Sequence, residues 1–315
     1  MKNIKKKILV TGGTGFIGSS IVNLLLTMKK EVVVYDNNFR GKIKRLALNQ
    51  KKIKLIKGDI RDLKKLEKAS IGIDTIIHLA YINGTKYFYT KPDLVLDVAI
   101  KGMINIIEIS KKNKIKNLFL ASSSEVYQTP TKIPTDENES LKIPYIFNPR
   151  YSYGGGKILS ELMSIHLGKK VFNKIIIFRP HNVYGPDMGQ EHVVPELISK
   201  IGAINKKNNK FYIEGSGNEI RSFIHIEDFT RAFKIIYEKG KHLNIYNIGT
   251  KEKIKIIDLA KLILKIIQKP IKIYKKPLKT GGTKIRVPDI KKIVNLGFKQ
   301  EISIEQGIRK ILFGN

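Results

Sequence analysis

Short hydrophobic runs rich in valine and isoleucine alternate with amphipathic stretches over the first 180 residues of the chain. Such runs are typical of buried strands, and they predict strands at 7–10, 31–36, 53–59, 75–80, 117–123 and 174–180. The stretches between them carry apolar residues at helical spacing, which predicts helices at 17–28, 62–69, 94–112 and 153–167. This alternation predicts an α/β fold, in which a doubly wound parallel sheet carries helices on both faces.

The alternation weakens after residue 180. A Gly-Ser-Gly turn stands at 215–217, and Pro277 and Pro288 interrupt the later sequence. These breaks predict a second, smaller lobe at 181–315 behind a first domain at 1–180. The sequence does not define this boundary sharply, because a strand-like run at 244–248 and other segments near 220–250 can also belong to the first domain.

A glycine-rich segment, TGGTGFIGSS, follows the first predicted strand and opens the first predicted helix. At such a place Gly12, Gly15 and Gly18 permit a tight turn and let backbone N–H groups approach a pyrophosphate, while the helix N-terminus attracts the anion. A Walker-type phosphate loop is excluded because Ser19 follows Gly18 where that motif needs lysine. The segment therefore predicts that residues 1–180 form a Rossmann domain that binds a dinucleotide.

Acidic residues end the second and third predicted strands. Asp36 follows Gly18 by one helix and one strand, where a carboxylate accepts hydrogen bonds from the adenosine ribose and repels a 2′-phosphate. This placement favours NAD over NADP as the cofactor. Asp59 ends the third strand, where it either reaches the adenine or caps the helix predicted at 62–69.

Several short motifs follow one another along the chain. They are TGGTGFIG at 11–18, YDN at 35–37, GDIRD at 58–62, HLA at 78–80, SSSEVY at 122–127, FRPHNVYGP at 178–186, IRSFIHIED at 220–228 and YNIG at 246–249. With Tyr153 and Lys157, they resemble the extended short-chain dehydrogenase/reductase family, whose members act on nucleotide sugars. The resemblance implies an NAD-dependent nucleotide-sugar epimerase/dehydratase, a substrate-binding lobe at 181–315 and a homodimer.

The segment YSYGGGK supplies the candidate catalytic pair. On a helix Tyr153 and Lys157 are one turn apart and face the same side, whereas Tyr151 points elsewhere. A phenol with a pKa of about 10 is a poor base at neutral pH, and a neighbouring ammonium together with the positive nicotinamide favours the phenolate. The resemblance implies that Tyr153 takes a proton from the sugar, usually at C4, that Lys157 also binds the nicotinamide ribose, and that Ser123 hydrogen-bonds the reacting hydroxyl.

The 4-keto sugar that results can follow three routes in this family. We favour a UDP-hexose 4-epimerase, because that activity is frequent among the relatives and needs no further acid or base. Glu125, next to Ser124, keeps a UDP-glucuronate decarboxylase or an NDP-sugar 4,6-dehydratase open, since both use extra polar groups at this strand end. A dormant NAD-binding regulatory protein is an alternative of another class, against which the intact Ser123, Tyr153 and Lys157 argue.

The resemblance also implies further binding residues and two departures from the family pattern. Asn182, Arg221 and Arg286 are predicted to bind the substrate, Arg because its planar fork meets two phosphate oxygens at once. Further cofactor contacts are implied for Phe16, Ile17, Asn37, Ile60, Leu79, Ala80 and Pro180. Ala99 stands where relatives commonly have asparagine, and Gly154, Gly155 and Gly156 separate Tyr153 from Lys157. We expect these glycines to make room for the nicotinamide or the sugar, at a cost of about 2 to 3 kcal/mol of helix stability.

Composition changes this picture little. The formal charge is +32, but the 59 basic residues are spread along the whole chain, which indicates biased composition and no specific nucleic-acid partner. The chain has no cysteine, which fits a reducing compartment, and we expect a cytoplasmic protein. No hydrophobic stretch is long enough for a membrane span, and the six histidines lack metal-ligand spacing, so neither a membrane segment nor a metal is expected.

Overall fold

The computed structural model describes residues 7–204, 210–269, 271–277 and 283–314. In chain order, with η marking 3-10 helices, the first elements are β1 (Lys7–Thr11), α1 (Phe16–Thr27), β2 (Glu31–Asp36), η1 (Ile43–Lys52), β3 (Ile53–Lys57), α2 (Leu63–Ala69), β4 (Thr75–His78), α3 (Thr85–Thr90), α4 (Pro92–Lys112), β5 (Asn117–Ala121), η2 (Ser124–Val126), α5 (Tyr151–His166), η3 (Gly168–Lys170) and β6 (Lys174–Pro180). The later elements are β7 (Val183–Tyr184), α6 (Val193–Gly202), β8 (Lys210–Glu214), β9 (Ile220–Arg221), β10 (Ile224–His225), α7 (Ile226–Lys239), β11 (Asn244–Ile248), β12 (Ile254–Lys255), α8 (Ile256–Ile266), β13 (Lys272–Lys276), β14 (Ile285–Arg286), α9 (Lys291–Val294) and α10 (Ile304–Phe313).

A seven-stranded parallel sheet forms the centre of the molecule, in the order β11-β6-β5-β4-β1-β2-β3. The order reverses between β1 and β4, which is the switch point of a doubly wound sheet. Each of the strands expected in residues 1–180 is present, so the prediction of a doubly wound α/β sheet is confirmed. The run 244–248 also returns to this sheet as β11, beside β6.

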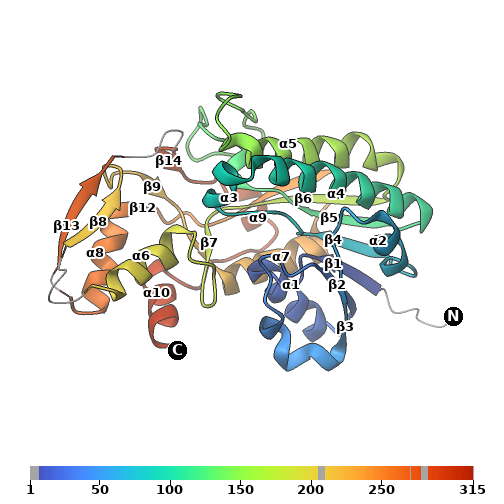
Figure 1. The fold of residues 1–315 in the computed structure, drawn as a ribbon, viewed down its shortest axis with the longest axis horizontal. Coiled ribbons are helices and arrows are strands. Elements are labelled where there is room, and N and C mark those ends of the chain that lie inside the picture. The colour runs from blue at the N-terminus through green and yellow to red at the C-terminus, as the bar shows by residue number, and fades with distance from the viewer. Residues whose placement is uncertain (1–6, 205–209, 270, 278–282, 315) are drawn as a thin grey trace.

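Helices cover both faces of the sheet, with α4 and α5 on one side and α1 and α7 on the other (Figure 1). Strand β1 shows why: Ile8 and Val10 pack toward α1 and α7, whereas Leu9 between them packs toward the α4 side. Side chains alternate across a strand, so a strand buried on both faces reads as a continuous apolar run. Burying each of these side chains contributes about 1.5 to 3 kcal/mol.

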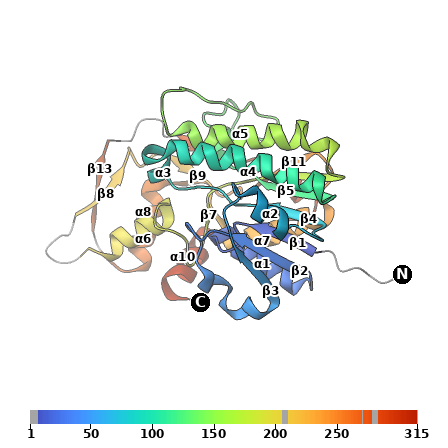
Figure 2. The same cartoon turned by 45° about the vertical axis from the view of Figure 1, so that its right-hand side comes forward.

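A smaller lobe lies beside the sheet. Figures 1 and 2 both show α6, α8, β8 and β13 grouped together at one end of the molecule. These elements and α10 share an apolar core of their own, in which Leu197, Phe211, Leu259, Ile263 and Ile308 are buried. Within the described ranges, no helix is long and apolar enough to cross a membrane.

Helices α4 and α5 pack closely, and the glycines of α5 explain how. An added Cβ at Gly156 would overlap the Tyr81 hydroxyl and lie 2.9 Å from the Cβ of Ala99 on α4. At Gly154 it would lie 3.0 Å from the Glu125 carbonyl oxygen. Protein atoms therefore occupy the space beside these glycines, and the expectation that they make room for a ligand is wrong.

Replacing Gly156 by alanine is expected to lower the free energy of unfolding by about 1 to 3 kcal/mol, because overpacking at the Tyr81 hydroxyl outweighs the gain in helix propensity. Gly155→Ala is the matched control: its Cβ would meet only the end of the Ile143 side chain, at 3.3 Å. That variant is expected to be as stable as the parent or about 1 kcal/mol more stable. Urea unfolding of both variants measures the difference, and equal stabilities would contradict the packing argument.

Candidate functional site

A cavity of about 1560 Å³ lies between the carboxyl ends of the sheet strands and the smaller lobe. Parallel α/β sheets bind ligands at this edge, at the switch point of the strand order. Its wall includes many of the residues predicted from sequence: Gly12, Gly15, Phe16, Ile17, Gly18, Leu79, Ser123, Glu125, Tyr153, Lys157, Pro180, Asn182, Arg221 and Arg286. The cavity therefore brings the candidate catalytic residues, the glycine turn and the candidate substrate residues together.

The glycine turn links β1 to α1 with close backbone approaches. Gly12 has a φ of +74°, and an added Cβ there would lie 2.7 Å from the backbone nitrogen of Ala80. At Gly18 a Cβ would overlap the carbonyl oxygen of Gly12, so only glycine allows the helix to start this close to the strand. Gly15 caps α1 without a side-chain acceptor, and it therefore leaves the first N–H groups of the helix free for an anion.

Asp36 ties the glycine turn to β2. Its buried carboxylate accepts hydrogen bonds from the backbone N–H of Thr14, at 3.0 Å, and of Asn38, at 2.8 Å. A carboxylate with two such donors is oriented before any ligand binds. Its predicted contact with the adenosine ribose stays a prediction, because Asp36 lies beside the cavity and does not line it.

Asp59 takes part in a charged pair at the end of β3. Its carboxylate accepts from Arg61 Nε at 2.9 Å and Nη2 at 2.7 Å, and Asn37 Nδ2 donates to it at 3.1 Å. The side-chain hydrogen bond with Arg61 contributes most to lowering the pKa of Asp59. The alternative that Asp59 caps the helix is wrong, since Asp62 caps α2 by accepting from the Lys65 N–H. Like Asp36, the four residues Asn37, Asp59, Ile60 and Ala80 do not line the cavity.

Tyr153 lies in the first turn of α5 and is almost completely buried. Its ring stacks on Phe88, with ring centroids 4.7 Å apart. Burial raises the pKa of the phenol to about 12, and a hydrogen bond with the Ser123 side chain acts in the opposite direction. The structure thus brings Ser123 and Tyr153 together, and burial outweighs the effect of the protein groups around the phenol. The expected effect of the nicotinamide charge on the phenol pKa stays a prediction.

Lys157 follows one turn after Tyr153 and is buried. Its Nζ donates to the Ala121 carbonyl oxygen at 2.7 Å and lies 5.9 Å from the Tyr153 ring centroid. Burial lowers the pKa of Lys157 to about 7, and the carboxylate of Glu161 opposes this effect. The ammonium is therefore aimed at the end of β5, beside the phenol.

Glu125 is held by arginines. Arg286 Nη1 donates to Glu125 Oε1 at 2.7 Å, and Arg150 Nη2 lies 3.8 Å from the same oxygen. Burial alone would raise the pKa of Glu125, but Arg286 and Arg150 outweigh it and hold that pKa below its usual value. Arg221 is close enough to add to this effect. The group carries three positive charges around one negative charge.

The two other candidate substrate residues are fixed by backbone contacts. Asn182 has a left-handed φ of 41° and donates from Nδ2 to the Ser222 carbonyl oxygen at 2.8 Å. Arg221 donates to the carbonyl oxygens of Ile220, Thr283 and Lys284. Burial lowers the pKa of Arg221 to about 10, and Arg286 contributes in the same direction. Both side chains are thus preorganised in the cavity wall.

Sequence reasoning missed several residues of the cavity wall. Tyr81 directly follows the HLA motif at the end of β4, a position at the carboxyl edge of the sheet that was a usable signal. Arg40 and Glu191 also line the cavity and form an ion pair at 2.7 Å between two distant loops. No local pattern indicates such a pair, because its partners are far apart in the sequence.

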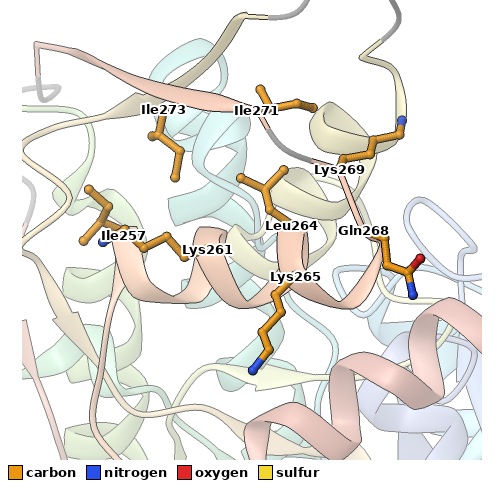
Figure 3. A pocket seen from close by; sticks show the side chains of 8 residues that line it. All are labelled: Ile257, Lys261, Leu264, Lys265, Gln268, Lys269, Ile271 and Ile273. Carbon is orange, nitrogen blue, oxygen red and sulfur yellow. The ribbon is translucent and has the colours of Figure 1, made fainter.

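A second, smaller hollow of about 570 Å³ lies on the surface of the smaller lobe, beside α8 (Figure 3). It is lined by Ile257, Lys261, Leu264, Lys265, Gln268, Lys269, Ile271 and Ile273. None of the candidate catalytic or binding residues lines it. We therefore assign the site to the larger cavity.

The residues present fit a bound NAD. The glycine turn lets the backbone approach a pyrophosphate, the free N–H groups of α1 face the same cavity, and Asp36 lies at the end of β2 with an oriented carboxylate. Tyr153 and Lys157 line the same cavity and would hold the nicotinamide end. One continuous cavity can hold the extended dinucleotide.

Comparison with known proteins agrees with this arrangement. A model of the NAD-dependent epimerase/dehydratase family matches residues 8–249. A putative UDP-glucose 4-epimerase of Methanocaldococcus jannaschii is 32% identical over 97% of both chains. A dTDP-D-glucose 4,6-dehydratase of Dictyostelium discoideum is 32% identical over 83% of this chain and 62% of its own length, so this chain spans under two thirds of it. The crystal structure of a Thermotoga maritima UDP-glucose 4-epimerase with UDP-glucose has a TM-score of 0.86, 26% identity and 97% coverage of both chains. The chain is therefore an enzyme of the NAD-dependent epimerase/dehydratase family, with NAD as its cofactor.

Proposed function

We propose that the protein is a nucleotide-sugar 4-epimerase that acts on a UDP-hexose. The observation that carries this proposal is the grouping of Ser123, Tyr153 and Lys157 in one cavity. Glu125 lines the same cavity, but its carboxylate is paired with Arg286. A 4-epimerase needs one proton-transfer group and no second acid or base. Two similar proteins named as 4-epimerases, each matched over 97% of both chains, support the choice.

In this proposal Tyr153 moves one proton. Its phenolate oxygen takes the proton of the C4 hydroxyl, and the hydroxyl of Ser123 holds the sugar oxygen in line. A bound NAD+ would supply the hydride acceptor for C4, and its positive charge would lower the phenol pKa from its value near 12. After the keto sugar turns over in the cavity, the hydride would return from the reduced cofactor to the other face of C4, and Tyr153 gives the proton back to the C4 oxygen.

The state of Glu125 argues against a 4,6-dehydratase. Such an enzyme must protonate a leaving hydroxyl at C6, which requires a carboxylic acid that holds its proton at neutral pH. The guanidinium groups of Arg286 and Arg150 hold the pKa of Glu125 low, so it stays ionised. Glu125 is therefore a poor acid and serves better to orient the arginines.

The same arginines favour UDP-glucuronate decarboxylation as the second candidate. Arg150, Arg221 and Arg286 outnumber Glu125, and the Nε groups of Arg150 and Arg286 are buried without a hydrogen-bond partner among the described residues. A hexuronate carboxylate would meet this positive excess. With a neutral hexose, only the diphosphate of the substrate would neutralise this excess positive charge.

Incubation with UDP-glucose, UDP-N-acetylglucosamine, UDP-glucuronate and dTDP-glucose tests the proposal by mass and proton NMR. Inversion at C4 with unchanged mass is the expected result, whereas loss of carbon dioxide or of water would identify the decarboxylase or the dehydratase. No turnover of any sugar, with NAD bound, would indicate a dormant site.

The variant Glu125→Gln separates the candidates further. A 4-epimerase is expected to keep kcat within about tenfold, because Glu125 only orients neighbours. If Glu125 is a general catalyst, the loss should be about 10² to 10⁴-fold. Glu139→Gln is a matched control, since its carboxylate also accepts hydrogen bonds from neighbouring residues but lies outside the cavity wall, on the loop after η2.

A further inference from the structure

Tyr81 lies between the two residues of the candidate catalytic pair. Its ring centroid is 3.8 Å from Lys157 Nζ, and its ring meets the Tyr153 ring edge-on, with centroids 5.2 Å apart and an interplanar angle of 89°. Tyr81 also lines the cavity. Its aromatic face is therefore closer to the Lys157 ammonium than the Tyr153 ring is.

Small residues on two helices leave the space in which the Tyr81 side chain packs. Its hydroxyl lies against Gly156 of α5, beside the Ala99 methyl group of α4, and a side chain at position 156 would displace it. Among the described residues this buried hydroxyl has no hydrogen-bond partner. An unpartnered buried hydroxyl is destabilising, so the useful part of Tyr81 is its ring.

The surroundings of Lys157 leave its charge finely balanced. Glu161 of α5 favours the ammonium, but its carboxylate is also paired with Arg179 of β6. His78 of β4 is buried, with a pKa of about 3, and is therefore neutral. Tyr153 is protonated at neutral pH in these surroundings. Besides the Ala121 carbonyl oxygen at 2.7 Å, the Tyr81 ring face is an electron-rich group in contact with Nζ.

We propose that Tyr81 is a positioning residue that keeps Lys157 protonated and aimed at the end of β5 through a cation–π contact. A desolvated ammonium over an aromatic face gains more from this contact than an exposed one. Ala99 and Gly156 then serve one purpose, which is to admit the Tyr81 ring. The inference rests on the proposed roles of Tyr153 and Lys157 in proton transfer.

The first test is the pH profile of kcat for Tyr81→Leu. Activity should fall as the pH rises through the Lys157 pKa, because the neutral amine no longer supports the phenolate. Removing the ring should shift this alkaline limb about one pH unit lower. At pH values above the limb of the parent enzyme, kcat should then be about tenfold lower, with little change in KM. Tyr81→Phe keeps the ring face and should restore both kcat and the limb.

Tyr237→Leu is the matched control. Tyr237 is also half-buried and stacks on Phe119, with centroids 5.2 Å apart, but it does not line the cavity. Its loss should reduce stability without moving the pH limb. A Tyr81→Leu enzyme that is slower with an unshifted limb, or one that keeps the parent profile, would overturn the proposal.

A second measurement uses the parent protein, so it stands even if Tyr81→Leu does not fold. In NMR spectra of protein with labelled lysine ε-methylenes, assigned by comparison with Lys157→Met, the Lys157 protons should be shifted upfield by the Tyr81 ring. They should titrate near neutral pH. An unshifted Lys157 signal would overturn the inference. Because this readout needs no turnover, its failure is distinguishable from failure of the proposed function, which the sugar panel tests.

Discussion

Tyr153→Phe is expected to bind NAD as the parent enzyme does and to lose turnover by about 10³-fold or more, since general acid–base catalysis contributes on the order of 10² to 10⁴-fold and no second base is available to a 4-epimerase. Phenylalanine keeps the ring that stacks on Phe88 and meets Tyr81, so the fold and the cavity should be preserved. Calorimetric titration with NAD and an assay with the preferred sugar measure the two properties.

Tyr151→Phe is the control for this variant. Tyr151 lies two positions earlier in α5 and is also buried, but it does not line the cavity. Its phenylalanine variant should keep kcat. Comparable turnover in the Tyr153 and Tyr151 variants would remove Tyr153 from the proton-transfer step.

Glu161→Gln is expected to lower the free energy of unfolding by about 3 to 5 kcal/mol, because it leaves the buried Arg179 guanidinium without its counter-charge. Both side chains are almost completely buried, and Arg179 donates to Glu161 from Nε at 2.9 Å and from Nη2 at 2.6 Å. The Ser122 hydroxyl donates to the same carboxylate. Urea unfolding measures the loss.

Two further variants identify the source of this loss. Glu305→Gln breaks the exposed Arg309–Glu305 pair on α10 and should cost at most about 0.5 kcal/mol. The double variant Glu161→Gln, Arg179→Met removes both charges and should recover part of the stability. A Glu161 variant no less stable than the Glu305 variant would show that the buried pair does not stabilise the fold.

Glu161→Gln should also change the pH profile of kcat. The carboxylate of Glu161 opposes the lowering of the Lys157 pKa, so without it the alkaline limb of the profile should move to lower pH.

The helices and strands, the glycine turn and the choice of Tyr153 were predictable from sequence, because each depends on a local pattern of residues. Valine- and isoleucine-rich runs identify strands, since the sheet buries both faces of β1. Glycines 12, 15 and 18 follow from the geometry of one turn. Helical periodicity alone separated Tyr153 from Tyr151, and only Tyr153 of the two lines the cavity.

The expectations that failed depended on contacts that are remote in sequence. We expect the glycines of α5 to leave space for a ligand, but the Tyr81 hydroxyl, from the segment after β4, and Ala99 of α4 occupy the space beside Gly156. Burial raises the phenol pKa of Tyr153, an effect that the Tyr-Lys spacing does not reveal. Neither the packing neighbours of a helix nor the desolvation of a side chain is visible in the spacing of residues.

The sequence by itself determined the alternation of strands and helices, the dinucleotide turn and the Tyr153–Lys157 pair, because each depends on residues within one turn or one strand. Tertiary structure alone decided that β11 joins the sheet beside β6, that Arg286 forms an ion pair with Glu125 and that the Tyr81 hydroxyl packs against Gly156. These contacts join segments far apart in the chain, and their energies come from burial and charge pairing, which exist only once the chain has folded.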